Sequence, residues 1–126
     1  MSTKQRTNFP PAIKEMRAST SLLLGPDGVP DVLPPTADEL VTLTETLREH
    51  IQLLIPEVAK AAARQPKDSV PRYCALACIG EAHNKLHLGD DDALPVRVSV
   101  ARKLARVVNA LCDHWENLVG ATHPDG

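Results

Sequence analysis

The sequence is poor in aromatic residues and has no long apolar run. Its 126 residues include a single Phe, Tyr and Trp, namely Phe9, Tyr73 and Trp115. Because 43% of the residues are nevertheless hydrophobic, the core must be built from aliphatic side chains. No stretch approaches the roughly 20 apolar residues of a transmembrane helix, and Leu22 to Leu24 is too short for a signal peptide. We therefore expect a cytoplasmic protein that does not associate with membranes.

The sequence also lacks an excess of charge of one sign. Lys and Arg number 14 and Asp and Glu number 16, which gives a formal net charge of -2. Without a basic tail, and with few aromatic rings to stack on bases, nucleic acid is not an expected partner. Four cations do lie close together: Arg97, Arg102, Lys103 and Arg106. Acidic neighbours such as Asp113 favour a solvated face there, while docking of an acidic partner and a nucleic-acid-linked regulator remain alternatives.

Cysteine is scarce as well. Cys74, Cys78 and Cys112 are an odd number, and their spacing matches no common disulfide framework or zinc site. We interpret them as small core residues in a reducing compartment. Cys112 lies near His114 only in sequence, so it does not indicate a catalytic pair.

Proline, in contrast, is abundant and divides the chain. All 11 prolines except Pro56 fall where the helical spacing of apolar residues starts or stops. The spacing predicts four helices, at about residues 11–24, 36–61, 69–88 and 94–119. The first is expected to end at the Gly25 to Gly28 turn, and the third at Gly89.

The second predicted helix has the strongest start signal. Thr36 and Glu39 form a capping box, in which each side chain satisfies a free amide of the other residue. Pro56 lies nearly opposite the apolar stripe, which favours a solvent-side kink over a break. A stripe this narrow requires a second helix to cover it. Its members are Leu40, Leu43, Leu47, Ile51, Leu54, Val58 and Ala61.

The third predicted helix begins at Asp68-Ser69, with Pro71 in its first turn. Leu76 and Ala77 lie off its main apolar face, so we expect more than one neighbouring helix and predict that this is the most buried of the four. The main face contains Ala75, Cys78, Ile79, Ala82 and Leu86.

The fourth predicted helix follows Asp90 to Asp92, whose charges suit a helix N-terminus. Residues 95–100 also alternate as a strand would, but the only pairing segment, 29–33, contains Pro30, so we favour the helix. The apolar face comprises Val96, Val100, Leu104, Val107, Val108, Leu111, Trp115, Leu118 and Val119, and the polar face Arg102, Arg106, Asn109, Asp113 and Asn117.

Four such helices predict an all-α, four-helix-bundle-like fold, with one short N-terminal helix and three long amphipathic ones. We expect a single domain at residues 11–120, a disordered tail at 1–10 and a flexible tail at 121–126. The short first helix cannot cover the stripes of the second and fourth over their whole length. The sequence therefore predicts a homodimer or another protein partner; a single domain with a partly exposed groove would account for the stripes equally well.

His83 and His87 stand four residues apart, so both rings project from one side of the third helix. Such a pair can share a metal ion if other helices supply further ligands. The candidates for those ligands are His50, His114, Asp113 and Glu116. No Glu-x-x-His pair of the di-iron bundle type is present, so we predict no bound metal or other cofactor.

His114 lies within the apolar stripe of the fourth helix, next to Trp115. A polar residue in such a stripe is typical of a hydrogen-bonded register position and, less often, of a ligand site. If a small molecule binds, the predicted ligand-binding residues are Tyr73, His83, His87, His114 and Trp115.

Three segments carry a resemblance to a known family. They are the proline-rich Leu33-Pro34-Pro35-Thr36, the central Ala75-Leu76-Ala77-Cys78 with Arg72, and Ala101-Arg102-Lys103-Leu104-Ala105-Arg106 leading to His114-Trp115. Over about residues 20–120 the chain resembles small uncharacterised actinobacterial helical proteins labelled as a natural-product biosynthesis family. The resemblance implies a setting in secondary metabolism and carries no catalytic residues. We therefore expect a noncatalytic interaction, regulatory or accessory protein; the alternative is a small-molecule-binding or metal-dependent helical-bundle enzyme in natural-product biosynthesis.

Overall fold

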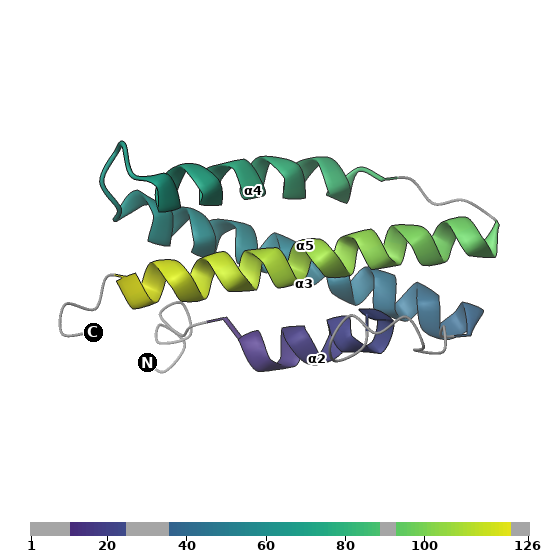
Figure 1. The fold of residues 1–126 in the computed structure, drawn as a ribbon. Helices are drawn as coiled ribbons and strands as arrows, with labels where there is room; N and C mark the ends of the chain where they lie inside the picture. Colours follow the sequence, from purple (N-terminus) through teal and green to yellow (C-terminus); the bar gives the residue numbers. More distant parts are fainter. Residues whose placement is uncertain (1–10, 25–35, 89–92, 122–126) are drawn as a thin grey trace, which may run out of the picture.

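The computed structural model describes residues 11–24, 36–88 and 93–121. These residues form four α-helices, and no strand occurs among them: α2 (Ile13–Leu24), α3 (Ala37–Ala63), α4 (Val70–Leu86) and α5 (Leu94–Ala121) (Figure 1). The predicted all-α fold is confirmed, and residues 95–100 belong to a helix. The predicted turn at 25–28, the helix end at Gly89, the acidic residues 90–92 and the tails at 1–10 and 122–126 lie outside the described residues, while residue 121 belongs to α5.

Two helices begin as their sequences predict. The side-chain oxygen of Thr36 accepts a hydrogen bond from the backbone N–H of Glu39 at 3.2 Å, and the Glu39 carboxylate accepts one from the Thr36 N–H at 3.0 Å. Ser69 caps α4 by accepting from the Arg72 N–H at 3.3 Å. Both caps satisfy amides that have no partner within the first helical turn.

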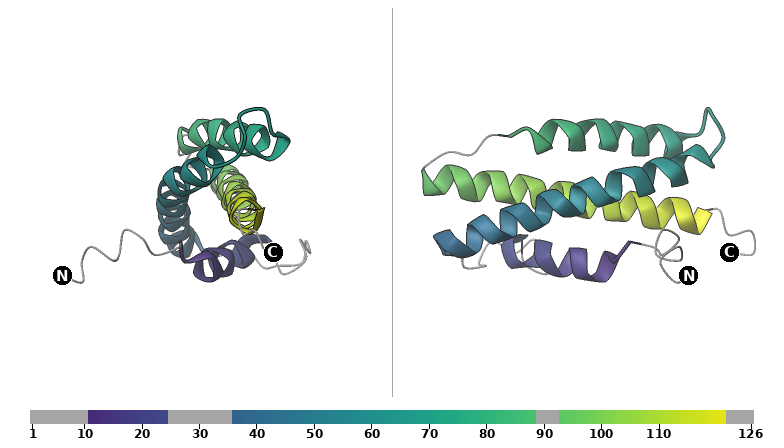
Figure 2. Two further views of the ribbon diagram at one scale, coloured as in Figure 1. Left: turned by 90° about the vertical axis from the view of Figure 1, so that its left-hand side faces the viewer. Right: turned by 180° about the vertical axis from the view of Figure 1, so that it is seen from behind.

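The four helices form a flattened bundle. Neighbours in sequence are antiparallel, so α3 and α5 run in the same direction, and these two make the most extensive contact (Figures 1 and 2). α4 packs on one side of this pair, against both of its helices. α2 packs on the other side, mainly against α5, and α2 and α4 do not contact each other. The α3/α5 pair therefore separates two peripheral helices that share no contact.

The core lies mainly between α3 and α5. Every residue of the predicted stripe on α3 is buried, and Pro56 is exposed on the opposite side. On α5, Ala101, Ala105 and Cys112 are completely buried, and five residues of the predicted apolar face are buried with them: Leu104, Val107, Val108, Leu111 and Leu118. Of the rest of that face, Val100, Trp115 and Val119 are partly buried and Val96 is exposed. The three small residues are buried because α5 has α2, α3 and α4 around it. None of the described helices contains a stretch both long and apolar enough to span a bilayer.

The prediction that the third helix is the most buried is wrong. Only Ala75 and Ala82 of α4 are buried, and they lie on its predicted inner face. The partly buried Ile79 and Leu86 pack against the core from the same face. Leu76, one of the two residues that suggested a second neighbour, is 46% exposed. No described helix covers the outside of α4, because its only neighbours are α3 and α5.

Arginine side chains form hydrogen bonds at both ends of α4. Arg72 donates from Nη1 to the backbone carbonyl of Gln65 at 3.1 Å, across the turn before α4. Arg48 of α3 donates from Nη2 to the carbonyl of Leu88 at 3.0 Å, just beyond the other end of α4. Hydrogen bonds from charged donors to otherwise free carbonyls hold this surface helix in register with α3.

Candidate functional site

The outward side of α4 is exposed and apolar between residues 70 and 80, and the exposed Glu81 and Asn84 follow on the same side of the helix. Val70 is 70% exposed, Tyr73 is 74% exposed, and Leu76, one turn further along the helix, is 46% exposed. Three smaller residues, Cys74, Ala77 and Gly80, lie on the same side. Because successive residues of a helix are about 100° apart, the six residues span roughly 160° of its circumference, opposite the buried Ala75 and Ala82. We call this surface the α4 outer face; it comprises Val70, Tyr73, Cys74, Leu76, Ala77 and Gly80, all exposed.

Gly80 is the unusual member of the α4 outer face. A glycine inside a helix is less favourable than alanine by about 1 kcal/mol, because it loses more backbone entropy on folding. A Cβ atom built at Gly80 meets no heavy atom within 4 Å, so packing within the described part of the chain does not require glycine there. The missing side chain leaves room for another surface to approach the helix backbone.

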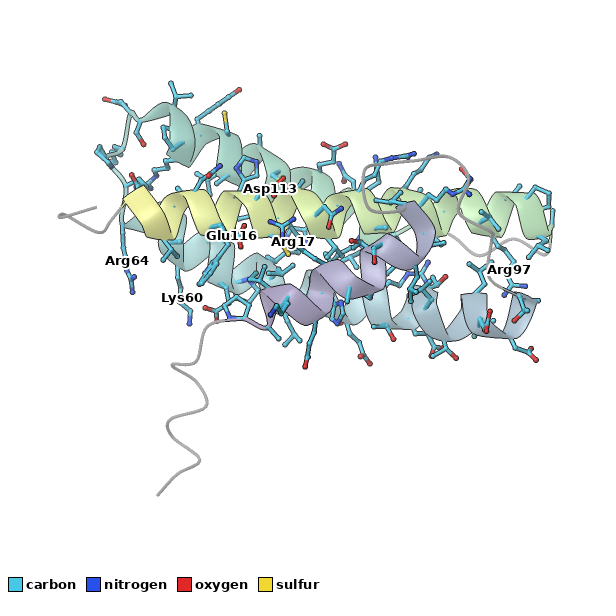
Figure 3. The ribbon with its side chains drawn as sticks, turned by 60° about the horizontal axis from the view of Figure 1, so that its bottom comes forward. Arg17, Lys60, Arg64, Arg97, Asp113 and Glu116 are labelled. Carbon is cyan, nitrogen blue, oxygen red and sulfur yellow. The ribbon has the colours of Figure 1, made fainter. Side chains whose placement is uncertain are left out.

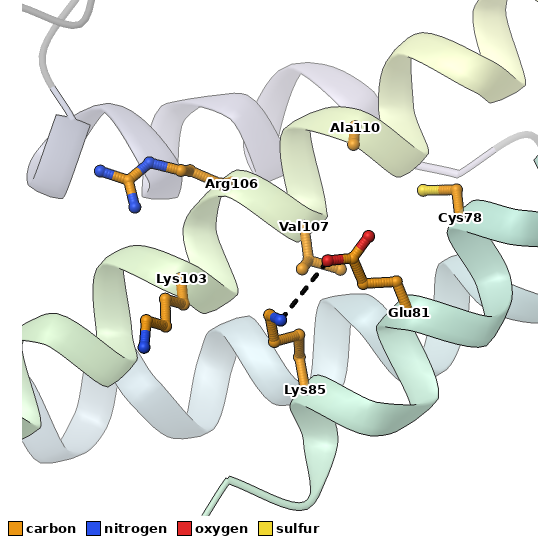
Figure 4. Close-up of a pocket in the computed structure, with 7 residues that line it drawn as sticks. All are labelled: Cys78, Glu81, Lys85, Lys103, Arg106, Val107 and Ala110. Atoms are coloured by element: carbon orange, nitrogen blue, oxygen red, sulfur yellow. Dashed lines mark hydrogen bonds and ion pairs between the residues drawn. The ribbon is translucent and has the colours of Figure 1, made fainter.

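An open groove lies beside this face, between α4 and α5 (Figure 4). Its volume is about 380 Å³, at the lower end of the range of roughly 300–1,000 Å³ found for small-molecule pockets. We call it the α4/α5 groove. It is lined by Cys78, Glu81 and Lys85 of α4 and by Lys103, Arg106, Val107 and Ala110 of α5.

The charges around the α4/α5 groove are mostly positive. Lys85 Nζ lies 3.4 Å from Glu81 Oε2, so one cation is paired within the groove. Within residues 11–24, 36–88 and 93–121, Lys103 and Arg106 have no ion-pair partner. Burial raises the pKa of the Cys78 thiol, and Glu81 and Asp113 add to the increase, so Cys78 is a neutral, weakly polar part of the lining. The groove thus combines a positive rim with an apolar floor.

The acidic residues that were expected to balance the basic stretch of α5 bind α2 instead. Arg17 Nη2 donates to Asp113 Oδ1 and to Glu116 Oε1, each at 2.7 Å (Figure 3). Partial burial by itself lowers the pKa of Arg17, but these two hydrogen bonds and the charge of Asp113 together outweigh it, and the pKa is raised. Beside this pair, the Thr20 hydroxyl donates to Asn109 Oδ1 at 2.8 Å. Two residues of the predicted polar face of α5, Asn109 and Asp113, therefore bind α2.

The structure distributes the five predicted ligand-binding residues over two helices. Tyr73 belongs to the α4 outer face, His83 is exposed on α4, and His87 is the exposed residue that caps its C-terminus. At about 1.5 Å per residue, Tyr73 and His87 are roughly 21 Å apart along the helix, too far to surround one small ligand. On α5, His114 and Trp115 are half-buried, and Trp115 packs against the core. None of the five lines the α4/α5 groove, although His114 follows Ala110 by one turn.

The candidate metal ligands and the candidate nucleophile do not form a site either. Among the described residues, no group of three or more His, Cys, Asp or Glu side chains is arranged to hold a metal ion. Burial raises the pKa of Cys112 to about 11, against the opposing effect of Arg17, so this thiol is protonated at neutral pH and unsuited to nucleophilic attack. His50, a candidate metal ligand, faces α2 instead, with Nδ1 3.3 Å from Ser19 Oγ.

Sequence reasoning found only part of the groove. Lys103 and Arg106 belong to the basic stretch identified on the predicted fourth helix, but Glu81 and Lys85 were not singled out. Their spacing of four residues indicates only an ion pair on a helix surface. The contact of α4 with α5 is what brings Lys85 to the same groove as the cations of α5.

Comparisons with known proteins give one informative result. A family model described as "Family of unknown function (DUF6415)" matches residues 14–120, which extend from the first turn of α2 almost to the end of α5. No curated protein and no solved structure matches the chain. The matched region contains the α4 outer face and the α4/α5 groove.

Proposed function

Because the chain belongs to the family of unknown function DUF6415, we propose a function from its own surface: it is a noncatalytic helical module that pairs with a second copy of itself through the α4 outer face. The observation that carries this proposal is the exposure of Val70, Tyr73 and Leu76 on one side of a helix whose other side is already packed. A helix that is apolar on both sides normally has partners on both sides.

The size of the face supports a weak, reversible dimer. α4 has 17 residues. The α4 outer face covers residues 70–80 of this helix, about 15 Å of its length, and the helix is about 10 Å across, so the face offers roughly 250 Å². Stable interfaces bury about 800 Å² on each partner. We therefore expect pairing that depends on protein concentration.

The composition of the face favours a second copy as the partner. A two-fold interface brings the same patch of both subunits together. With two antiparallel α4 helices crossing at Ala77, Gly80 lies opposite the partner's Cys74, and small residues at the crossing allow a short distance between the helix axes. None of the six residues of the α4 outer face is charged, so no like charges oppose each other there. The face is thus self-complementary in size and in charge.

Sedimentation equilibrium over a range of about 10 μM to 1 mM tests the proposal, because standard-size interfaces give dissociation constants from micromolar to picomolar and this one is smaller. The wild-type chain should show a dimer fraction that increases with concentration. Leu76→Glu should remain monomeric, since it places two carboxylates in the interface. Leu53→Glu is the matched control: Leu53 is 60% exposed on α3, away from the α4 outer face, and this variant should dimerise as the wild type does. A wild type that stays monomeric throughout, or equal dimerisation by both variants, would refute the proposal.

The setting of this module is part of the same proposal. The family resemblance of the segments quoted above suggests an accessory or regulatory role in actinobacterial natural-product biosynthesis. The three cysteines are free, which supports a cytoplasmic location, where thiols stay reduced. Turnover of a pathway intermediate by the purified protein alone would contradict the noncatalytic role.

A further inference from the structure

We propose that the α4/α5 groove binds a small amphipathic anion, an aliphatic carboxylate whose head group sits among the cations and whose chain lies on the apolar floor. This site adjoins the proposed dimer surface at Glu81, but its seven lining residues and the six residues of the α4 outer face are different. The inference rests on three features of the groove: its charge, the order of its residues and its size.

The charge favours an anion. Three cations and one carboxylate line the groove, which leaves two positive charges without compensation there. The ion pair between Lys85 and Glu81 is long at 3.4 Å, and Glu81 is 64% exposed, so it is a weak surface pair that Lys85 can exchange for a ligand. Lys103 and Arg106 need no exchange, since the described residues offer them no ion-pair partner.

The order of the residues favours an amphipathic ligand. Along α5, Lys103 is followed one turn later by Val107 and then by Ala110, so the positive end of the groove precedes its apolar end. Figure 4 shows Cys78 of α4 at the apolar end, near Ala110, and the Lys85–Glu81 ion pair beside Val107, between the two ends. The neutral thiol of Cys78 behaves there as a small apolar surface. A ligand with one charged end and one apolar end matches this polarity.

The size favours a small molecule. Lys103 and Ala110 are separated by about 10 Å along the helix, at about 1.5 Å per residue. A volume of about 380 Å³ accommodates a medium-length fatty acid and excludes a folded domain. Two uncompensated charges are also few compared with the six or more phosphate contacts typical of proteins that bind nucleic acid strongly.

Isothermal titration calorimetry with octanoate, below its aggregation concentration, is the direct test. Octanoate should bind with a stoichiometry of one per chain. Octyltrimethylammonium has the same chain with the opposite charge, and acetate has the same head group without the chain. Both should bind at least about tenfold more weakly, because each loses one of the two kinds of contact. Equal binding of octyltrimethylammonium and octanoate, or no binding of octanoate at millimolar concentration, would overturn the proposal.

Variants locate the site. Lys103→Gln combined with Arg106→Gln should weaken octanoate binding at least about tenfold, because charge-assisted hydrogen bonds are lost. Both side chains are exposed, so the fold should not change, which circular dichroism will verify. The control is Lys14→Gln, which also replaces an exposed cation by a neutral side chain. Lys14 lies on α2, which does not contact α4. Unchanged octanoate affinity in the double variant would refute this location.

Two more measurements separate this site from its alternatives. Ala110→Phe should fill the apolar end and abolish octanoate binding, while Leu76→Glu on the α4 outer face should bind octanoate as the wild type does. A short polyglutamate peptide should not compete with octanoate, since it lacks an apolar chain. Tight binding of the peptide without binding of octanoate would assign the groove to an acidic protein and contradict our inference.

Discussion

The two peripheral helices flank the same α3/α5 pair but are held by different forces. α2 inserts Met16 and Leu23, both 3% exposed, and adds the hydrogen bonds of Arg17 and Thr20 to α5. α4 inserts mainly small residues, with Ala75 and Ala82 completely buried. The difference shows that α2 uses most of its large apolar side chains to complete the fold, whereas α4 leaves several of its own in solvent. Of these two helices, α4 therefore offers a partner the larger apolar surface, since α2 exposes only Leu22 among its large apolar residues.

The largest expected effect compares a buried and an exposed leucine. Leu23→Ala in α2 should reduce the free energy of unfolding by about 2–5 kcal/mol, because it removes a buried side chain and leaves a cavity. Leu76→Ala in α4 should change it by less than about 0.5 kcal/mol at protein concentrations where the chain is monomeric. Urea unfolding measures both values. Similar losses in the two variants would show that the α4 outer face is buried in solution, contrary to the contrast drawn above.

A smaller effect tests the polar attachment of α2. Arg17→Met should destabilise the protein by about 0.5–1 kcal/mol, because Asp113 and Glu116 lose their common partner while remaining about half-exposed. The loss should shrink in 1 M salt, which screens surface charges. Lys14→Met on the exposed side of α2 serves as the control and should have little effect. A salt-independent loss would indicate that Arg17 acts through its apolar stem instead.

Gly80 provides a test of comparable size and opposite sign. Gly80→Ala should stabilise the monomer by about 0.5–1 kcal/mol, because alanine is the better helix former and its Cβ meets no neighbour. Gly120, near the end of α5, also has free space, but a position close to a frayed terminus should gain less. Thermal unfolding of dilute protein measures the difference. Destabilisation by Gly80→Ala would mean that another surface already occupies this space.

The smallest effect concerns the contact of α2 with α3. Burial lowers the pKa of His50 below its ordinary value of 6.5, and the nearby carboxylates of Glu49 and Glu15 oppose the shift only in part. The unfolded chain therefore binds a proton at His50 more readily than the folded chain does. This contribution to stability is complete above pH 6.5 and is lost as the pH falls below 6.5 toward the pKa of the folded state.

His50→Asn should flatten that portion of the pH dependence. The measurement is the free energy of unfolding from urea titrations between pH 5 and 8, compared between the variant and the wild type. An unchanged slope would show that His50 is equally easy to protonate in both states, and hence that α2 does not shield it from water.

Prediction from sequence succeeded where a local rule applies. The capping box at Thr36, the cap at Ser69 and the complete stripe of α3 follow from residue spacing within one segment, since the helical period and the free amides of the first turn are local properties. The error about α4 arose because Leu76 and Ala77 have the same spacing whether a helix or solvent lies beside them. Periodicity identifies a face, but it does not identify what covers that face.

The candidate site was predictable to the same limited degree. The basic stretch containing Lys103 and Arg106 was visible in the sequence, but its acidic neighbours were expected to balance it. Asp113 and Glu116 instead bind Arg17, which precedes Asp113 by 96 residues. Likewise, Lys85 lines the same groove as Lys103 and Arg106 only because of which faces of α4 and α5 pack together. Long-range pairings of this kind have no signature within a short segment.

The sequence by itself determined that this chain is helical, where its described helices lie and which residues form the stripe of α3, because hydrogen bonding within a helix and burial of one face depend on neighbours a few residues apart. Only the tertiary structure decided that α3 and α5 form the central pair, that α2 neutralises the acids of α5, and that one side of α4 stays in solvent beside a positively charged groove. These outcomes depend on the packing of whole helices, in which side chains distant in sequence compete for the same partners.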